Sequence, residues 1–263
     1  MKKNSISILG SGWLGLPLAT DLIQQGYPVR LSTRQTEKLT SFEQLGATPY
    51  LVDIDKALFP EGFFDSDSLI CNITSKNQSG FTNLIDQIAH SPIQHILFIS
   101  SSSVYLNTNT IVTEDEGAEN PDSKLFQIEQ AFQACSHFET TILRLSGLIG
   151  NQRHPGRFFA NGKVVPLPDA PVNLIHRDDC IGLISQIIEQ SAWGDVFNGC
   201  ADTHPTKREF YSHARHLLNQ SPPIFSDQTH GQTKTVSNAK IKQRLGYHFK
   251  YPDVMQIPFN EMG

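Results

Sequence analysis

The stretch SISILGSGWLGLPLATDL, residues 5–22, decides the fold of this chain. It places Gly10, Gly12 and Gly15 between a short apolar run and an amphipathic helical pattern. In such a turn the first glycine permits a tight bend, the second lets a pyrophosphate approach backbone amides, and the third lets the helix pack closely on the strand. The pattern therefore predicts a strand, a dinucleotide-binding turn that includes Trp13 and Leu14, and a helix.

Short β-rich runs alternate with longer helical patterns through the first half of the chain. Because strands that alternate with helices form βαβ units, this order predicts the α/β class, with a doubly wound parallel sheet of the Rossmann type. We expect strands at residues 5–9, 29–32, 49–52, 68–73, 95–99 and 140–145, and helices at 13–25, 35–45, 81–90 and 123–135.

The texture of the sequence changes after Gly150, where Pro, Gly and Asn become frequent. We expect an NAD(P)-binding Rossmann domain over residues 1–150, with residues 177–198 returning to it as a helix and a short strand. Residues 151–176 and 199–263 are expected to form a smaller substrate-binding lobe over the carboxyl edge of the sheet, where ligands of such folds bind. This lobe includes a helix at 206–218, opened by the capping box TKRE, and another from about residue 237 to Gly246.

Composition excludes several classes of protein. The 263 residues include 21 Lys and Arg against 26 Asp and Glu, without a basic cluster, so we expect a small-molecule ligand and neither nucleic acid nor membrane. The four cysteines are far apart and predict no metal site; we expect them to be small buried residues in a reducing cytoplasm. The start MKK before an apolar run is superficially like a secretory signal, but the spaced glycines favour a strand and a turn.

The residues after the second predicted strand bear on which dinucleotide binds. An NAD-selective site places a carboxylate there, about 20 residues after the glycines. Here the chain has Ser32, Thr33 and Arg34. A 2′-phosphate would therefore find no carboxylate that repels it, and it could bind a planar cation and two hydroxyl donors. This favours NADP(H) and leaves NAD possible, since Arg34 can instead be a solvated loop cation. Asp53, after the third strand, is either an acceptor for the adenine amino group or a turn former.

Several motifs in order along the chain resemble the extended short-chain dehydrogenase/reductase family, the NAD-dependent epimerase/dehydratase type. They are the glycine turn, FISSSSVY, LRLSGLIG, NLIHRDD, VFNGC and KIKQRLGYHFKYPD. The resemblance implies a Rossmann lobe, a smaller C-terminal substrate lobe, and redox chemistry at a carbon that bears a hydroxyl, often on a nucleotide sugar. The glycine spacing departs from the family in one place, because Leu9 stands where the longer-spaced pattern has glycine.

The serine cluster after the fifth strand is the first half of a candidate active site. The resemblance places the family's substrate-orienting Ser or Thr on Ser101, with Ser102 and Ser103 beside it as substrate contacts. A hydroxyl there can donate to a carbonyl oxygen as negative charge develops on it during hydride addition. The alternative is that the serines bond local backbone at the end of a strand.

The second half of that site departs from the family. A Tyr and a Lys four residues apart on the following helix supply its proton transfer. The segment ENPDSKLFQIEQAF has Lys124 but no tyrosine, and Asn120 stands four residues before the lysine. Lys124 then serves a proton relay, binds a ribose hydroxyl, or is a solvated lysine, while Tyr105 is expected to pack. The chain resembles an atypical bacterial branch of the family that lacks the tyrosine.

Two other segments offer polar groups. His176 lies where the family contacts substrate and titrates near neutral pH, so it is a candidate catalytic residue, or else a structural one. The loop RHPGRFF offers Arg153, His154 and Arg157 to an anionic substrate, or places them at the surface.

These observations favour an NADP(H)-dependent oxidoreductase or epimerase-like enzyme that acts on a hydroxyl or carbonyl carbon of a small substrate, with sugar nucleotides as one candidate class. The missing tyrosine keeps open a non-catalytic protein that binds or senses NAD(P). A β-hydroxyacid dehydrogenase has similar glycine spacing but continues into a long all-helical domain, which the strand end at the serines disfavours. We expect a cytoplasmic monomer or homodimer.

Overall fold

The computed structural model of the chain describes residues 4–229 and 231–259. Two compact units form from interleaved segments. The first unit contains residues 1–100, 121–143 and 184–196, and the second contains residues 101–120, 144–183 and 197–263.

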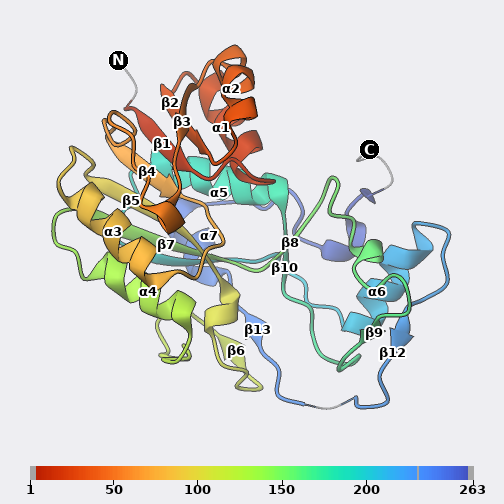
Figure 1. Cartoon of the computed structure of the whole chain (residues 1–263). Helices are drawn as coiled ribbons and strands as arrows, with labels where there is room; N and C mark the ends of the chain where they lie inside the picture. The colour runs from red at the N-terminus through yellow and green to blue at the C-terminus, as the bar shows by residue number, and fades with distance from the viewer. Residues whose placement is uncertain (1–3, 230, 260–263) are drawn as a thin grey trace. The chain divides into compact units, whose positions relative to one another are not determined.

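A seven-stranded sheet is the central element, with the order β11-β7-β5-β4-β1-β2-β3 (Figure 1). The strands are β1 (Ile6–Leu9), β2 (Val29–Thr33), β3 (Thr48–Leu51), β4 (Ser68–Cys71), β5 (His95–Ser101), β7 (Glu139–Leu145) and β11 (Val196–Gly199). β1 pairs in parallel with both β2 and β4, with Ile8 opposite Leu31 on one side and Ile70 on the other. The chain therefore reverses its direction of travel across the sheet between β1 and β4, and the carboxyl ends of these two strands frame a crevice.

The prediction of an α/β doubly wound sheet is confirmed, and each predicted strand is present with ends shifted by at most two residues. The sheet has seven strands because the short segment at residues 196–199 joins it beside β7. β5 continues to Ser101, two residues further than expected, so the serine cluster begins inside the strand.

The helices begin and end close to the predicted residues. They are α1 (Gly15–Gln24), α2 (Leu39–Leu45), α3 (Gln78–Ala89), α4 (Lys124–Gln133) and α5 (Arg177–Glu189). α1 begins two residues late because residues 11–14 form the turn, and the helix predicted from residue 35 divides into the short helix η1 (Thr36–Lys38) and α2. α3 begins three residues early, since Asn77 caps it by accepting from the Gly80 amide at 3.2 Å.

Aromatic side chains fill the core between one face of the sheet and the helices α3 and α4, which lie side by side in Figure 1. Phe81 from α3, Phe98 from β5 and Phe132 from α4 are at most 1% exposed. Their ring centroids lie 5.0–6.0 Å apart in edge-on and tilted pairs. Such pairs add to the stabilisation from apolar burial and fix the helices against β5, the strand that carries the serines.

The second unit has its own small core and short strand pairs. β8 (Gly147–Ile149) pairs with β10 (Leu174–His176), β9 (Val164–Val165) with β12 (Ile224–Phe225), and β6 (Ile111–Val112) with β13 (Thr235–Val236). The predicted capping box is confirmed at α6 (Lys207–His216), where Thr206 and Glu209 satisfy each other's backbone amides. α7 (Ala239–Leu245) ends at Gly246 as predicted.

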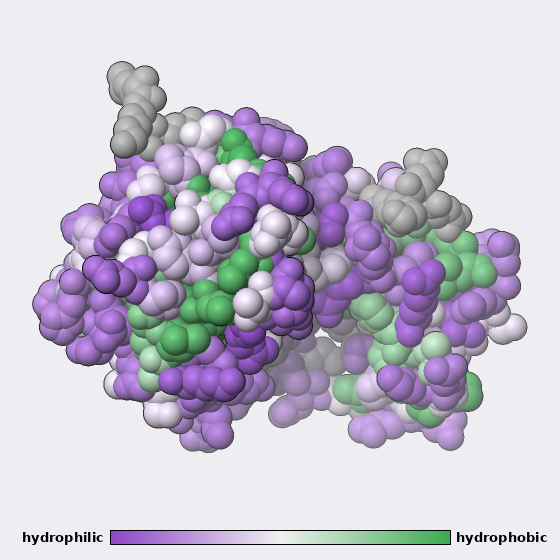
Figure 2. Space-filling model, turned by 45° about the horizontal axis from the view of Figure 1, so that its top comes forward, coloured by the Kyte–Doolittle hydropathy of each residue, from purple (hydrophilic) through white to green (hydrophobic). Residues whose placement is uncertain are grey.

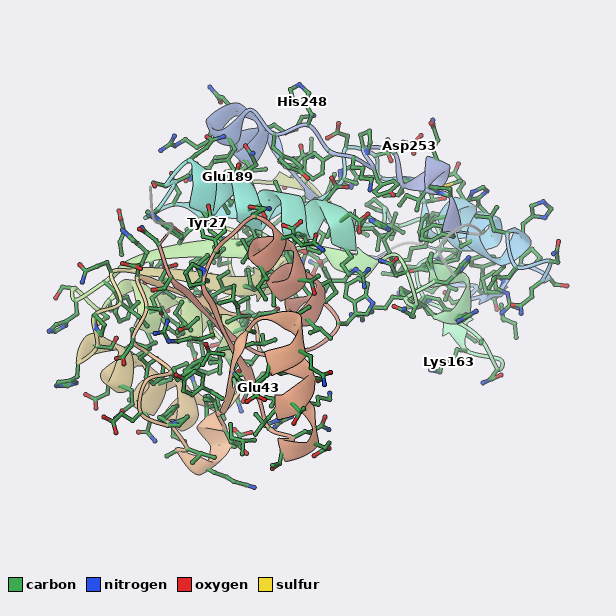
Figure 3. All side chains as sticks on the ribbon, turned by 90° about the horizontal axis from the view of Figure 1, so that it is seen from above. Tyr27, Glu43, Lys163, Glu189, His248 and Asp253 are labelled. Carbon is green, nitrogen blue, oxygen red and sulfur yellow. The ribbon has the colours of Figure 1, made fainter. Side chains whose placement is uncertain are left out.

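Short helical turns complete the chain: η2 (Ile54–Lys56), η3 (Ser102–Val104), η4 (Pro155–Arg157) and η5 (Val254–Gln256). Asp253, labelled in Figure 3, caps η5 by accepting from the Met255 amide at 2.9 Å. Each of these turns follows a side chain that accepts from a backbone amide, so polar residues fix the irregular parts of both units.

Polar side chains cover most of the face shown in Figure 2, and apolar ones gather in strips. Within residues 4–229 and 231–259, none of the helices combines the length and apolar character that a membrane span requires. Cys71, Cys180 and Cys200 are buried as expected, whereas Cys135 is only partly buried.

Candidate functional site

The turn between β1 and α1 depends on two glycines that the backbone itself requires. Gly10 has φ +105°, and a Cβ there would lie 2.3 Å from the carbonyl oxygen of Asn72. A Cβ on Gly15 would lie 1.9 Å from the carbonyl oxygen of Gly10. Neither position can hold a side chain without moving backbone, so the tight turn and the close helix contact predicted for these glycines are both present.

Gly12 differs from its two neighbours. A Cβ at this position would have no described atom within 4 Å, and its φ lies outside the left-handed range. The fold therefore does not require a glycine here. The absence of a side chain leaves open space beside the amides at the start of α1, where Leu14, the N-cap residue, makes no side-chain hydrogen bond in the described chain. The Leu16 amide at this helix start donates to the Gly12 carbonyl at 3.1 Å and Pro17 has no amide hydrogen, so a phosphate here would bind amides of the turn itself.

A cavity of about 440 Å³ opens beside this turn, entirely within the first unit. It brings together six residues of the predicted cofactor site, which are Gly10, Gly12, Ser32, Thr33, Arg34 and Asp53. It also has a set of lining residues that the sequence did not single out, which are Leu9, Ser11, Gln35, Lys38, Val52, Ile54, Asp55 and Asn72 to Ser75. The other three residues of the predicted cofactor site, Trp13, Leu14 and Gly15, are not in the described lining of the cavity. They form the end of the turn and the start of α1.

The two hydroxyls at the end of β2 accept hydrogen bonds from the backbone. Ser32, 2% exposed, accepts from the Gly10 amide at 2.8 Å and so ties the end of β2 to the glycine turn. Thr33 accepts from the Gln35 amide at 3.1 Å and fixes the bend that leads to Arg34. Both hydroxyls thus shape the cavity wall.

Charges of both signs line this wall. The Arg34 side chain is 70% exposed, and its Nη1 lies 3.8 Å from Oδ2 of Asp55. Lys38 lines the same cavity. Asp53 caps η2 by accepting from the Asp55 amide at 3.0 Å, which is the turn-forming alternative considered for it.

Three hydroxyls of the serine cluster, those of Ser100, Ser101 and Ser102, take part in different hydrogen bonds. Ser100 donates to the buried carboxylate of Glu129 on α4. Ser101 caps η3 by accepting from the Ser103 amide at 3.1 Å. Ser102 is 7% exposed and accepts from the Ser146 hydroxyl at 3.3 Å, while Ser103 is exposed. Local backbone bonding is therefore present at Ser101, although its hydroxyl hydrogen is not used in that bond.

Tyr105 packs in the second unit, as predicted. Its ring is 3% exposed, and its hydroxyl donates to Oδ1 of Asn198 at 2.9 Å and accepts from Arg144 at 2.8 Å. Burial raises the pKa of Tyr105 to about 12 despite the opposing effect of Arg144. This phenol is therefore protonated at neutral pH, and its oxygen is engaged in two hydrogen bonds.

Lys124 and Asn120, four residues apart, lie in different parts of the structure: Lys124 begins α4, and Asn120 lies in the loop before it. Lys124 is exposed as the first residue of α4, which Ser123 caps by accepting from the Phe126 amide at 3.4 Å. The backbone amide of Asn120 donates to the carbonyl of Val104 at 2.8 Å. Lys124 belongs to the first unit, and Ser101 and His176 belong to the second.

His176 is buried where the sequence suggested a residue near the cleft. Its ring is 1% exposed, its Nδ1 accepts from the Asp178 amide at 3.2 Å, and the Tyr251 ring lies 4.1 Å away. A Cβ on Gly150 would lie 2.2 Å from Nε2, so this glycine makes room for the imidazole. Burial lowers the pKa of His176 to about 4, with Asp178 opposing that shift and Lys250 and Arg177 adding to it. The imidazole is neutral at physiological pH.

The loop after β8 has one buried and two exposed polar groups. His154 is 5% exposed and caps η4, where its Nδ1 accepts from the Gly156 amide at 3.0 Å. Burial and the neighbouring Arg157 lower its pKa. Arg153 and Arg157 are exposed on either side of it. Of the three predicted substrate contacts in this loop, only the two arginines present charge to solvent.

Comparison with known proteins identifies the family. No family model matches the chain. Protein YeeZ of Escherichia coli (strain K12) is 31% identical over 275 residues, which cover 98% of this chain and 99% of YeeZ. The chain belongs to the YeeZ family.

Solved structures share the fold of this YeeZ-family chain at lower identity. A functionally unknown conserved protein from Silicibacter pomeroyi has a TM-score of 0.81 and 21% identity, and covers 96% of each chain. UDP-glucuronic acid 4-epimerase from Bacillus cereus, solved with NAD, has a TM-score of 0.78 and 17% identity over 98% of this chain and 96% of the epimerase. A Methylobacillus flagellatus protein described as an NAD-dependent epimerase/dehydratase has a TM-score of 0.76 and 24% identity, over 95% and 94%. The resemblance in fold to that type is confirmed.

Most of the lining residues that the sequence missed in this YeeZ-family cavity follow the third and fourth strands. Asp55 lies two residues after Asp53, and Asn72 to Ser75 directly follow β4. A polar run after a buried strand of a parallel sheet faces the same edge as the glycine turn, so this run was a usable signal.

We predict that alanine substitution destabilises the fold at Gly10 but not at Gly12. Gly10→Ala is expected to lower the free energy of unfolding by about 1–3 kcal/mol, because the left-handed backbone and the Asn72 carbonyl both oppose a side chain. Gly12→Ala is expected to change it by less than ~0.5 kcal/mol. Urea unfolding of the two variants checks this, and an equal loss in both would contradict it.

We predict that His176 makes the second unit less stable in mild acid. Its pKa is about 4 in the folded chain against 6.5 when unfolded, so the unfolded state binds the proton first and stability falls as pH falls from about 6.5 towards 4. Between pH 7 and pH 5 this contribution is about 1–2 kcal/mol. His176→Asn keeps an acceptor near the Asp178 amide, and its unfolding free energy is expected to depend less steeply on pH. A slope equal to that of the unsubstituted chain would contradict this role.

Proposed function

We propose that this YeeZ-family chain is an NAD(P)-dependent oxidoreductase or epimerase-like enzyme that acts on a hydroxyl or carbonyl carbon of a small substrate, with sugar nucleotides as one candidate class. The observation that carries the proposal is the open space at Gly12, beside an uncapped helix start and a 440 Å³ cavity with Arg34 in its wall. A glycine that the backbone does not need is explained by a ligand that must approach closely.

The residues fit a nicotinamide dinucleotide. The amides of the turn beside Gly12 would hold the pyrophosphate, with Gly10 and Gly15 shaping that turn. The cavity wall after β2 and β3 would hold the adenosine ribose, and Asp53 the adenine end. When bound, the nicotinamide supplies or accepts a hydride. The Bacillus cereus epimerase was solved with NAD, which supports this class of cofactor.

Arg34 supports a preference for NADP(H) within that class. Its guanidinium is exposed in the cavity wall, and Lys38 lines the same cavity. A planar guanidinium can bind a phosphate through two hydrogen bonds, and the sequence offers no carboxylate directly after β2. NAD(H) remains the second candidate, because Asp53 and Asp55 also line the cavity.

Ser101 is the residue that we propose to orient the substrate oxygen. Its hydroxyl accepts from the Ser103 amide and keeps its own hydrogen for a carbonyl oxygen on which charge develops. Ser103, Arg153 and Arg157 are exposed and are proposed as substrate contacts. Lys124 remains a candidate for the proton relay.

Three other predicted residues receive a supporting role in this proposal. Ser102, His154 and His176 are buried and accept hydrogen bonds from within the second unit. His176 is neutral at pH 7, so it is not an imidazolium acid, and its Nδ1 already accepts from the Asp178 amide.

A second function, dinucleotide sensing without catalysis, is favoured by the occupied Tyr105 hydroxyl and by Asn120 in place of the family's tyrosine. The β-hydroxyacid dehydrogenase alternative needs a long all-helical second domain. In the described chain, the second unit instead has short strand pairs, the helices α6 and α7 of 10 and 7 residues, and the first residues of α5.

We predict that NADPH, NADP⁺, NADH and NAD⁺ stabilise the protein in a thermal-shift titration, since a ligand bound by the native state adds RT ln(1 + [L]/Kd). The phosphorylated pair is expected to bind more tightly. Arg34→Met is expected to weaken NADPH binding about tenfold, or ~1.4 kcal/mol, and to leave NADH within about threefold. No shift with any of the four would overturn the proposed cofactor class.

We predict that Ser101→Ala leaves Kd for NADPH unchanged and lowers turnover at least tenfold on a carbonyl substrate found by screening for NADPH consumption. Ser221→Ala, which changes an exposed serine of the second unit outside the proposed site, is the matched control and is expected to leave turnover within about twofold. Equal turnover in Ser101→Ala removes this residue from the mechanism. Failure of every carbonyl substrate in the panel, with tight dinucleotide binding, favours the sensing function.

A further inference from the structure

One wall of the cavity holds a cation and an anion that favour different dinucleotides. Nη1 of Arg34 lies 3.8 Å from Oδ2 of Asp55, and both residues line the cavity. The Asp55 side chain is 44% exposed, so its charge is partly screened by solvent but directly accessible to a ligand. A group that approaches the guanidinium therefore also approaches this carboxylate.

Asp55 is fixed in place by the loop after β4. Its Oδ1 accepts from Nδ2 of Asn77 at 2.8 Å and from the Ser75 hydroxyl at 3.5 Å. Asn77 in turn caps α3, and a Cβ on Gly80 in the first turn of α3 would lie 2.9 Å from the carbonyl oxygen of Ile54. The carboxylate is thus anchored to the start of α3, and it cannot turn away without breaking these bonds.

The two dinucleotides differ in what they present to this pair. The adenosine ribose of NADP(H) carries a 2′-phosphate with acceptor oxygens and nearly two negative charges, which binds the guanidinium and is repelled by a fixed carboxylate. The ribose of NAD(H) carries a neutral hydroxyl there, which can donate to a carboxylate. Arg34 and Asp55 therefore act in opposite directions on the same choice.

We propose that Asp55 limits the preference for NADP(H) and so makes the cavity accept both dinucleotides. The inference rests on the proposed function. The carboxylate that the sequence lacks directly after β2 is supplied by the loop after β3, where the chain returns beside Arg34.

The test is Asp55→Asn, an isosteric change that removes the charge and keeps an oxygen able to accept from Asn77. Isothermal titration of the full-length protein with NADPH and NADH gives the two dissociation constants. We expect NADPH to bind about tenfold more tightly to the variant, or ~1.4 kcal/mol, and NADH to bind equally or up to about threefold more weakly. The increase in the ratio is expected to shrink between low salt and 0.5 M NaCl, because half-exposed charges are screened.

Glu37→Gln is the matched control. Glu37 is an exposed acid of η1, three residues after Arg34, and it does not belong to the described lining of the cavity. Its loss changes the net charge by the same amount, and the ratio of dissociation constants is expected to stay within about twofold of that of the unsubstituted chain. The same ratio change in both variants would show a general field effect and overturn the role of Asp55.

The remaining outcomes separate this inference from the proposed function. If the unsubstituted chain binds a dinucleotide and Asp55→Asn leaves the ratio unchanged, the inference fails and the proposed function stands. If the unsubstituted chain binds none of the dinucleotides, the proposed function fails and the inference with it. A midpoint of thermal unfolding within a few degrees of the unsubstituted chain confirms that Asp55→Asn is folded.

Discussion

The contact between Gly15 and the carbonyl of Gly10 is the constraint on which the candidate site depends. With only hydrogen on Gly15, α1 begins directly against the turn that ends β1, and the carbonyl of Asn72 closes the other side of that turn at Gly10. Three segments thereby meet at the point where the order of strands reverses. The crevice found in open α/β sheets results from this reversal, and the backbone contacts at the two glycines set its width.

The polar residues around this crevice mainly form hydrogen bonds with nearby residues of the same crevice. Ser32 holds the glycine turn, Asp53 holds the turn that presents Asp55, and Asn77 holds both Asp55 and the start of α3. A ligand thus meets a wall whose hydroxyls and amides are already oriented. Such pre-organisation lowers the entropic cost of binding, because few side chains must be ordered by the ligand.

Local patterns in the sequence predict this fold well because the chain is locally consistent. The turn glycines, the capping box at Thr206 and Glu209, and the stop at Gly246 each specify an element end through backbone chemistry that depends on near neighbours. Burial of His176 was not predictable in this way, because its pocket is built by Gly150 and Tyr251, far away in the sequence. Asp55 was missed for a related reason. Its proposed role depends on its ion pair with Arg34, which lies on a different loop, and a single sequence does not reveal which loops lie side by side.

The hydrogen bonds of Asp179 tie the folding of the second unit to the order in which the chain is synthesised. Its carboxylate, fully buried, accepts from the amides of Lys250 at 2.6 Å and Tyr251 at 3.0 Å, and from the Tyr247 hydroxyl at 3.0 Å. Every one of these donors is synthesised about 70 residues after the acid that needs them, as the spacing of the two segments shows. During translation this carboxylate must stay hydrated until residues 247–251 leave the ribosome. The hydrogen bonds of Asp179 therefore form only after residues 247–251 are made, whereas the strands β1 to β4 have all their neighbouring strands in the sheet by residue 101.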